Sequence, residues 1–236
     1  MERILSELVE RLKSALADRL VTVILYGSAA VGDWNKDNSD LNVLCALDRI
    51  SPEELRKAEP VVSWWREPGR PPVLLLTAEE VRTSTDCFAI EFHDMKKFRR
   101  VLFGPDLIED LTVDNTFYRA QVEHELRSKQ IRLRQKAAEV LSKPERLLQL
   151  LVDSISTFCV LGRHALLLSG KEARWTKAEV VAGLEGALGR SLSAFNEILA
   201  VRESGKQPGG AAITLLLERY LVETDALVRF VDALAK

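Results

Sequence analysis

The chain has 236 residues, of which 47% are hydrophobic and 29% are charged. These values are typical of a globular protein of one or two domains, and they exclude a disordered, collagen-like or low-complexity chain. The 33 basic and 35 acidic residues give a formal net charge of -2. A generally basic protein that coats nucleic acid is therefore excluded.

The cysteines and the apolar runs predict a compartment. Cys45, Cys87 and Cys159 lie far apart and form no C-x-x-C pair. An odd number of cysteines suits no closed disulfide framework, so we expect a reducing, cytoplasmic setting. The N-terminal residues include an acidic side chain and no long apolar run, unlike a signal peptide. No uncharged apolar stretch reaches roughly 18 residues, and we expect no membrane span.

Helix and strand patterns alternate through the first half of the chain. Apolar residues recur at helical spacing over 3–16, and β-branched apolar runs at 21–26 and 41–47 indicate buried strands. Further predicted elements are a helix from Ser51, a strand over 73–76, a helix from Thr77, and strands over 87–92 and 100–103. The order of these elements predicts a mixed α/β domain over residues 1–112.

Only helical patterns follow from Thr116 onward. The predicted helices cover 117–141, 144–168, 176–188, 193–201 and 211–234. They predict an all-α bundle of four or five helices over residues 116–236. The helix over 144–168 is apolar on nearly all sides, so we expect it at the centre of the bundle or in a dimer interface. The predicted fold class is therefore α+β, with a helical bundle after a mixed sheet.

One motif in the first half carries chemistry. Gly27 and Ser28 follow a buried strand, where a tight turn exposes backbone N–H groups to an anion. Asp40 and Asn42 lie two apart on the next strand, so both side chains project to one face. Oxygen ligands beside an anion-binding turn suit a hard cation bound with a nucleoside triphosphate. The alternative is an ordinary strand-ending turn followed by a turn-closing Asp.

This motif resembles the signature of the nucleotidyltransferase (polymerase beta-like) superfamily, an apolar strand, Gly-Ser, about ten residues and Asp-x-Asp. The α/β half followed by a helical half resembles the minimal and kanamycin-type members, including those paired with HEPN helical bundles. The resemblance implies that Gly27 and Ser28 hold the triphosphate of an NTP. It implies that Asp40 and Asn42 bind Mg²⁺ or Mn²⁺, and that a third carboxylate on a later strand activates the acceptor hydroxyl.

The third carboxylate is assigned from strand alternation. Ile90 and Phe92 alternate with Glu91, so a strand at 87–92 would turn Glu91 away from the core and toward the site. Asp94 is the competing candidate if the strand ends earlier, and an exposed strand Glu is the alternative. Lys96 follows soon after Glu91 and is the candidate cation for the triphosphate.

Asn42 departs from the resemblance because it stands where the family has a second aspartate. Its amide oxygen can coordinate Mg²⁺ but is neutral, so the site loses one negative charge. The sequence thus predicts transfer of a nucleoside monophosphate from an NTP to a hydroxyl, weakened by Asn42. The alternative is a pseudoenzyme, a nucleotide-binding or antitoxin-like regulatory module. Its helical half would then contact a protein partner or a second copy of the chain.

The basic run over 127–136 is expected to be a solvated helix face, and the alternative is a contact with a triphosphate or an RNA backbone. A third and less favoured reading is a plain helical interaction protein that binds no nucleotide. In that case the α/β half would be only a scaffold.

Overall fold

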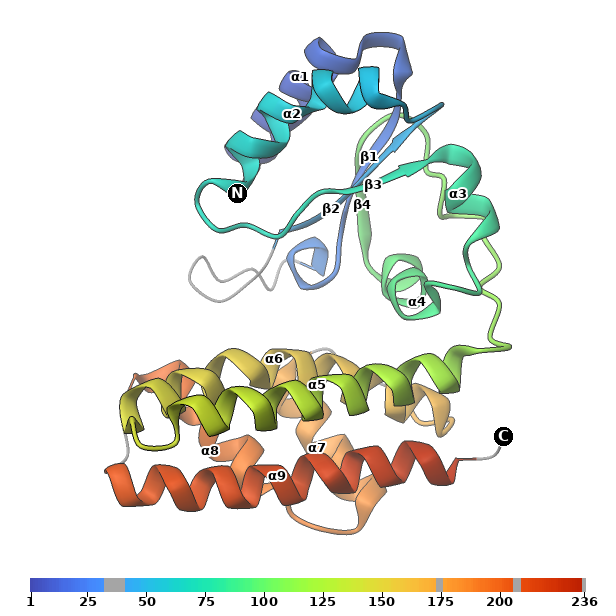
Figure 1. Ribbon diagram of the computed structural model, residues 1–236. Helices are drawn as coiled ribbons and strands as arrows, with labels where there is room; N and C mark the ends of the chain where they lie inside the picture. Colours follow the sequence, from blue (N-terminus) through green and yellow to red (C-terminus); the bar gives the residue numbers. More distant parts are fainter. Residues whose placement is uncertain (32–40, 173–175, 206–208, 235–236) are drawn as a thin grey trace. The chain divides into compact units, whose positions relative to one another are not determined.

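The computed structural model describes residues 1–31, 41–172, 176–205 and 209–234. The chain forms two compact units, Met1–Phe117 and Tyr118–Lys236, which we call the α/β unit and the helical unit (Figure 1). The predicted loop over 32–39 and the predicted metal ligand Asp40 lie outside the described residues.

The α/β unit is built on a mixed four-stranded sheet with the strand order β3-β2-β1-β4. The strands are β1 (Leu20–Tyr26), β2 (Asn42–Leu47), β3 (Leu74–Thr77) and β4 (Arg99–Phe103). β1 pairs antiparallel with β2 and with β4, whereas β2 and β3 are parallel. The central strands β1 and β2 are the most buried, as their nearly continuous apolar sequences predict.

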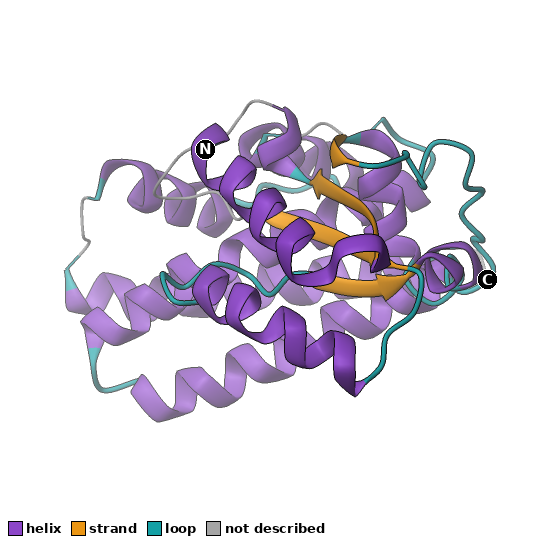
Figure 2. Ribbon diagram, turned by 90° about the horizontal axis from the view of Figure 1, so that it is seen from above, coloured by secondary structure: helices purple, strands orange, loops and turns teal. Residues whose placement is uncertain are grey.

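Helices cover both faces of this sheet (Figures 1 and 2). Helices α1 (Glu2–Leu16) and α2 (Pro52–Arg66) pack on the face that carries Val23 and Leu25. Helices α3 (Ala78–Thr83) and α4 (Ala89–Lys97) pack on the face that carries Ile24. Single turns of 3₁₀ helix, η1 (Ala17–Arg19) and η2 (Ser28–Val31), flank β1. Alternation along β1 therefore divides the core of this unit into two layers.

The helical unit contains five helices among its described residues. They are α5 (Tyr118–Val140), α6 (Pro144–Leu168), α7 (Lys177–Leu188), α8 (Ser193–Ser204) and α9 (Gly210–Ala233). Helix α6 contacts each of the other four, which confirms the predicted central position. It is long and apolar enough to cross a membrane, but 56% of its apolar window is buried within the structure. That burial fits the core helix of a bundle.

The prediction of a strand over 87–92 is wrong, because these residues lead into helix α4. Ala89, Phe92 and Met95 are buried at intervals of three residues, which is a helical period. The short alternation around Glu91 is compatible with both a strand and a helix. The spacing of the buried residues over the longer stretch indicates the helix. The strand predicted over 100–103 is confirmed as β4.

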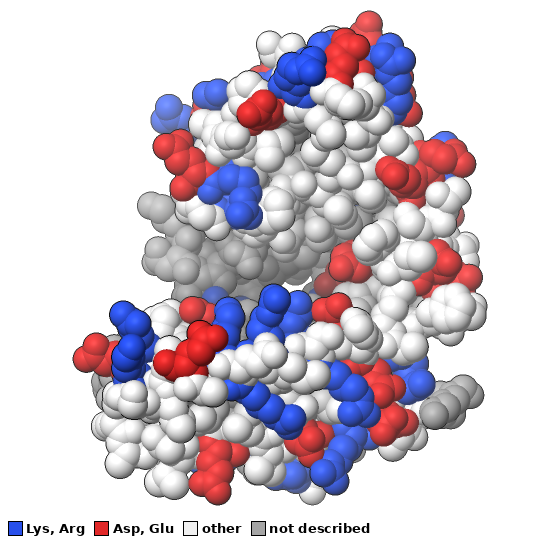
Figure 3. Space-filling view, in the orientation of Figure 1, with Lys and Arg blue, Asp and Glu red and all other residues white. Residues whose placement is uncertain are grey.

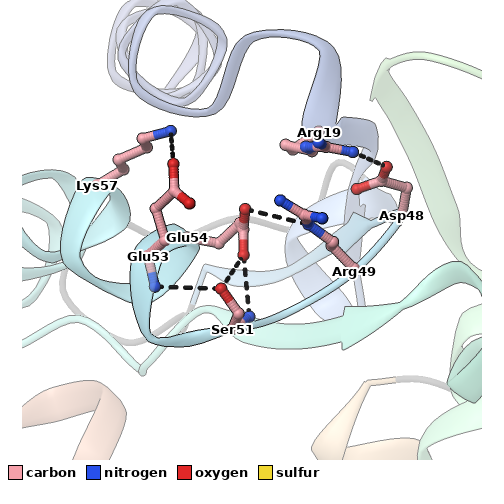
Figure 4. A network of polar contacts seen from close by, with 7 residues as sticks. All are labelled: Arg19, Asp48, Arg49, Ser51, Glu53, Glu54 and Lys57. Atoms are coloured by element: carbon pink, nitrogen blue, oxygen red, sulfur yellow. Dashed lines mark hydrogen bonds and ion pairs between the residues drawn. The ribbon is translucent and has the colours of Figure 1, made fainter.

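Helix α2 begins at a capping box, as the sequence Ser51-Pro52-Glu53-Glu54 predicts. Ser51 accepts a hydrogen bond from the Glu53 backbone N–H at 3.2 Å, and the Ser51 N–H donates to Glu54 at 3.0 Å (Figure 4). Glu54 is buried, and Arg49 approaches its carboxylate at 3.4 Å. This network lies beyond the last residue of β2, at the opposite end of the strand from Asn42, so it is a structural feature.

Candidate nucleotide-binding site

The candidate site begins at the turn that follows β1. Gly27 has a φ of +80°, a conformation that side-chain-bearing residues rarely adopt. Its N–H donates to the Phe98 carbonyl at 3.2 Å, and its carbonyl accepts from the Ala30 N–H at 3.0 Å. The turn is therefore fixed on one side to the start of β4 and continues into η2. The short helix expected after Ser28 is present as a single 3₁₀ turn.

Asn42, the first residue of β2, lies against this turn. A Cβ atom added to Gly27 would be 3.3 Å from Asn42 Nδ2, so the amide closely approaches the Gly27 backbone. Tyr26 pairs with Asn42 on β2 and with Arg99 on β4. Paired residues project to the same face of a sheet. Asn42, Tyr26 and Arg99 thus form a row across three strands, on the face covered by α3 and α4.

Two acidic residues of α4 act on this row. Burial, together with the charges of Glu91 and Asp94, raises the pKa of Tyr26 to about 12. Glu91 thus influences Tyr26, next to Gly27, although it belongs to a helix and not to a strand. The sequence did not single out Tyr26, because the packing of α4 against β1 leaves no local pattern. The role of Glu91 or Asp94 as the third carboxylate stays a prediction.

The predicted phosphate ligand Lys96 is hydrogen-bonded within the α/β unit. Its Nζ donates to the carbonyl of Glu109 at 3.4 Å and to that of Leu111. Nearby, Arg99 Nε donates to both carboxylate oxygens of Asp106, at 3.0 and 2.7 Å. Both cations therefore hold the segment after β4. A phosphate role for Lys96, which stays a prediction, would require it to exchange these carbonyl partners for the ligand.

Neither of the later strands carries a carboxylate. β3 has the sequence Leu-Leu-Leu-Thr, and β4 has the sequence Arg-Arg-Val-Leu-Phe. Leu44 of β2 pairs with Leu74 of β3, and extending this parallel register back by two residues places Pro72 beside Asn42. The third carboxylate implied by the resemblance is therefore absent from β3 and β4 of this chain.

The donor set limits the metal that this site could hold. Asp40 and the Ser28 side chain lie outside the described part of the chain. Within the described part, no group of three His, Cys, Asp or Glu side chains suits a metal ion. The Asp40 carboxylate and the Asn42 amide fit one Mg²⁺ that arrives with a triphosphate, since Mg²⁺ needs few protein ligands when phosphates contribute. They do not fit a second ion, for which further carboxylates would be required.

Comparisons with known proteins concern the domain and the fold. Residues 3–101 match the family model of the nucleotidyltransferase domain. The structure is similar to spectinomycin adenyltransferase AAD(9) from Enterococcus faecialis, solved with ATP and spectinomycin, with a TM-score of 0.58. The two are 14% identical, and the match covers 93% of this chain and 98% of that chain. No curated protein matches the sequence. The resemblance to nucleotidyltransferases is confirmed, as is the fold of a mixed sheet followed by a helical region.

Proposed function

We propose that the protein binds a nucleoside triphosphate with Mg²⁺ and transfers its nucleoside monophosphate to an acceptor hydroxyl. The matching nucleotidyltransferase domain supports transfer in general. The observation that carries the proposal is the turn at Gly27, whose positive φ and close contact with Asn42 leave backbone and amide groups together at the end of β1. Such a turn suits the close approach of phosphate oxygens to the backbone.

Each site residue has a role in this proposal. Gly27 and Ser28 bind the triphosphate, and Asp40 and Asn42 hold the Mg²⁺, which Mn²⁺ can replace. The bound ion neutralises charge on the phosphates. The acceptor oxygen attacks the α-phosphorus, pyrophosphate leaves, and the hydroxyl proton passes to a carboxylate. Glu91 of α4 is the proposed proton acceptor, because its charge already acts on Tyr26 beside the turn.

Asn42 makes this transfer slow. A neutral amide replaces a charged ligand where the metal must stabilise developing phosphoryl charge. That stabilisation is worth several kcal/mol, so its weakening should lower the rate by orders of magnitude. We therefore expect the natural chain to be less active than its Asn42→Asp variant.

The second candidate function is nucleotide binding without transfer. It is favoured by the sequences of β3 and β4, neither of which supplies a third carboxylate. In this case the α/β unit would sense a nucleotide, and the helical unit would contact a regulated protein, as in an antitoxin, or a second copy of the chain.

Incubation with each of the four labelled NTPs, with Mg²⁺ or Mn²⁺, separates the two functions. Transfer predicts slow pyrophosphate release by the natural chain, faster release by Asn42→Asp and none by Asp40→Ala. Gln135→Glu, which adds the same charge at an exposed position of α5, is the matched control and should change nothing. NTP binding without release in either the natural chain or Asn42→Asp would favour the second function. Release that survives Asp40→Ala would contradict the assigned roles.

A further inference from the structure

A pocket of about 190 Å³ lies between α5 and α6, within the helical unit. Lys129, Arg132 and Lys136 line its α5 side, and their spacing of three and four residues places them on one strip of the helix. Asp153 of α6 is the one carboxylate among the described lining residues. Basic side chains are also seen over these helices in the space-filling view (Figure 3). The pocket is therefore predominantly cationic.

Neighbouring acids balance only part of the positive charge of this pocket. Lys129 lies 3.3 Å from Glu125, and Asp153 accepts a hydrogen bond from Gln149 at 2.7 Å. Arg132 and Lys136 have no ion-pair partner in the described ranges of the chain. They lie four residues apart on α5, where like charges repel and destabilise a helix. A bound anion would offset this repulsion.

Several basic side chains of the helices pair with an acidic residue one turn away. Lys57 pairs with Glu53 on α2 at 2.7 Å, and Arg229 pairs with Asp225 on α9 at 2.7 Å, each across four residues. On α5, Arg127 pairs with Glu123 at 2.8 Å in the same way. Arg132 and Lys136 lack such a partner among the described residues, as does Arg134 of the same helix, and they differ from Arg134 in lining the pocket.

Part of the pocket lining is apolar. Leu133 of α5 and Phe158 of α6 are buried, at 3% and 1% exposure, so the half-buried Leu150 of α6 supplies the apolar surface that a ligand can reach. Ser154 and Thr157 line the α6 side, and the Ser154 hydroxyl donates to a backbone carbonyl of its own helix at 2.9 Å. We propose that this pocket binds a small phosphate ester carrying a flat ring, such as a nucleoside monophosphate. The phosphate contacts Arg132 and Lys136, and the ring packs against Leu150.

Calorimetric titration of the full chain with AMP, in buffer containing a chelator, tests this site. We expect saturable binding that Arg132→Gln and Lys136→Gln each weaken about tenfold or more, because each removes a charge-assisted hydrogen bond. Arg134→Gln, two residues away on α5 and outside the pocket lining, should leave the affinity unchanged. Gly27→Val should also leave it unchanged, because the turn at Gly27 belongs to the other unit. Circular dichroism verifies the fold of each variant.

Three further ligands define the recognised groups. Inorganic phosphate and ribose 5-phosphate lack the flat ring, and adenosine lacks the charge, so all three should bind more weakly than AMP. Absence of AMP binding would overturn the proposal, as would AMP binding that resists both Arg132→Gln and Lys136→Gln. Loss of AMP binding in Gly27→Val would also overturn it, because the ligand would then occupy the turn. Binding of a single-stranded RNA oligonucleotide without binding of AMP would identify a nucleic-acid surface instead.

Discussion

At the scale of single residues, Gly27 combines a positive φ, which suits glycine, with a close neighbour. Gly27→Ala should lower the free energy of unfolding by roughly 1 kcal/mol, because an L side chain is disfavoured at positive φ. The new methyl group would also lie 3.3 Å from Asn42 Nδ2 and displace that amide. We therefore expect both lower stability in urea and loss of NTP affinity.

Gly69→Ala is the matched control for this substitution. Gly69 has a φ of +83°, but an added Cβ would meet no atom within 4 Å. It should therefore lose similar stability while keeping its NTP affinity. Equal NTP affinity in Gly27→Ala and Gly69→Ala would remove the turn at Gly27 from the site.

Tyr26 reports on the acids of α4. Its pKa is raised to about 12, first by burial and then by the charges of Glu91 and Asp94. Glu91→Gln removes a negative charge that opposes formation of the phenolate, so the pKa of Tyr26 should fall. Burial remains, so the pKa should stay above the ordinary tyrosine value of about 10. Ultraviolet titration of the phenolate measures this shift, with Tyr26→Phe as the blank.

Glu139→Gln, on an exposed position of the helical unit, is the control for charge alone. It should leave the titration of Tyr26 unchanged. If the pKa of Tyr26 is the same in Glu91→Gln as in the natural chain, the Glu91 carboxylate lies away from the turn. It would then have no part in the proposed proton transfer.

At the scale of elements, the capping box of α2 gives a pH-dependent contribution. The hydrogen bond from Ser51 is the main cause that holds the pKa of Glu54 below its usual range. The stabilisation is therefore present above the unfolded pKa of about 4.3, and it is lost as the pH falls through the lower folded value. Ser51→Ala should cost about 1 kcal/mol at neutral pH, and this difference should shrink in acid.

Urea unfolding of the natural chain and Ser51→Ala across the acid range measures this effect. Ser6→Ala, at an exposed position inside α1, is the control and should show no such pH dependence. A cost of Ser51→Ala that stays constant into strong acid would contradict the assignment to the Glu54 carboxylate.

Helix α8 begins without a side-chain cap of its own and is capped from α9 instead. The buried Glu223 accepts hydrogen bonds from the N–H groups of Ala194, at 2.9 Å, and Phe195, at 3.1 Å. Glu223→Ala leaves these buried donors unpaired and should lower the free energy of unfolding by about 1–3 kcal/mol. Glu218→Ala, exposed on the same helix, should change it little. Thermal unfolding compares the two, and equal stabilities would contradict this capping role.

These elements mark what the sequence can and cannot predict. The start of α2 is predictable because Ser51 and Glu54 form a local pattern with a known cap geometry. The start of α4 is not predictable, because its first apolar residues fit both the strand and the helix period. Packing against the sheet selects the helix. The capping of α8 by Glu223 joins residues far apart in the chain, so no local sequence pattern predicts it.

At the scale of the whole molecule, the change of pattern at Thr116 lies beside the boundary between the two compact units. The position that we propose for the site, at the end of β1, follows from Gly27 and Asn42, which the sequence already singled out. The row formed with Tyr26 and Arg99 was not predictable, because it depends on the pairing of β1 with both neighbours. The division into an α/β domain over 1–112 and a helical bundle domain over 116–236 stays a prediction.

The central claim is our proposal that this chain carries a nucleotidyltransferase site in which the neutral Asn42 weakens metal binding and transfer. The most direct measurement is calorimetric binding of each NTP with Mg²⁺ to the natural chain and to Asn42→Asp. We predict weak binding to the natural chain and markedly tighter binding of both metal and NTP to the variant, because a carboxylate restores a charged ligand. Failure of both proteins to bind any NTP would contradict the claim and leave the turn at Gly27 as a scaffold feature.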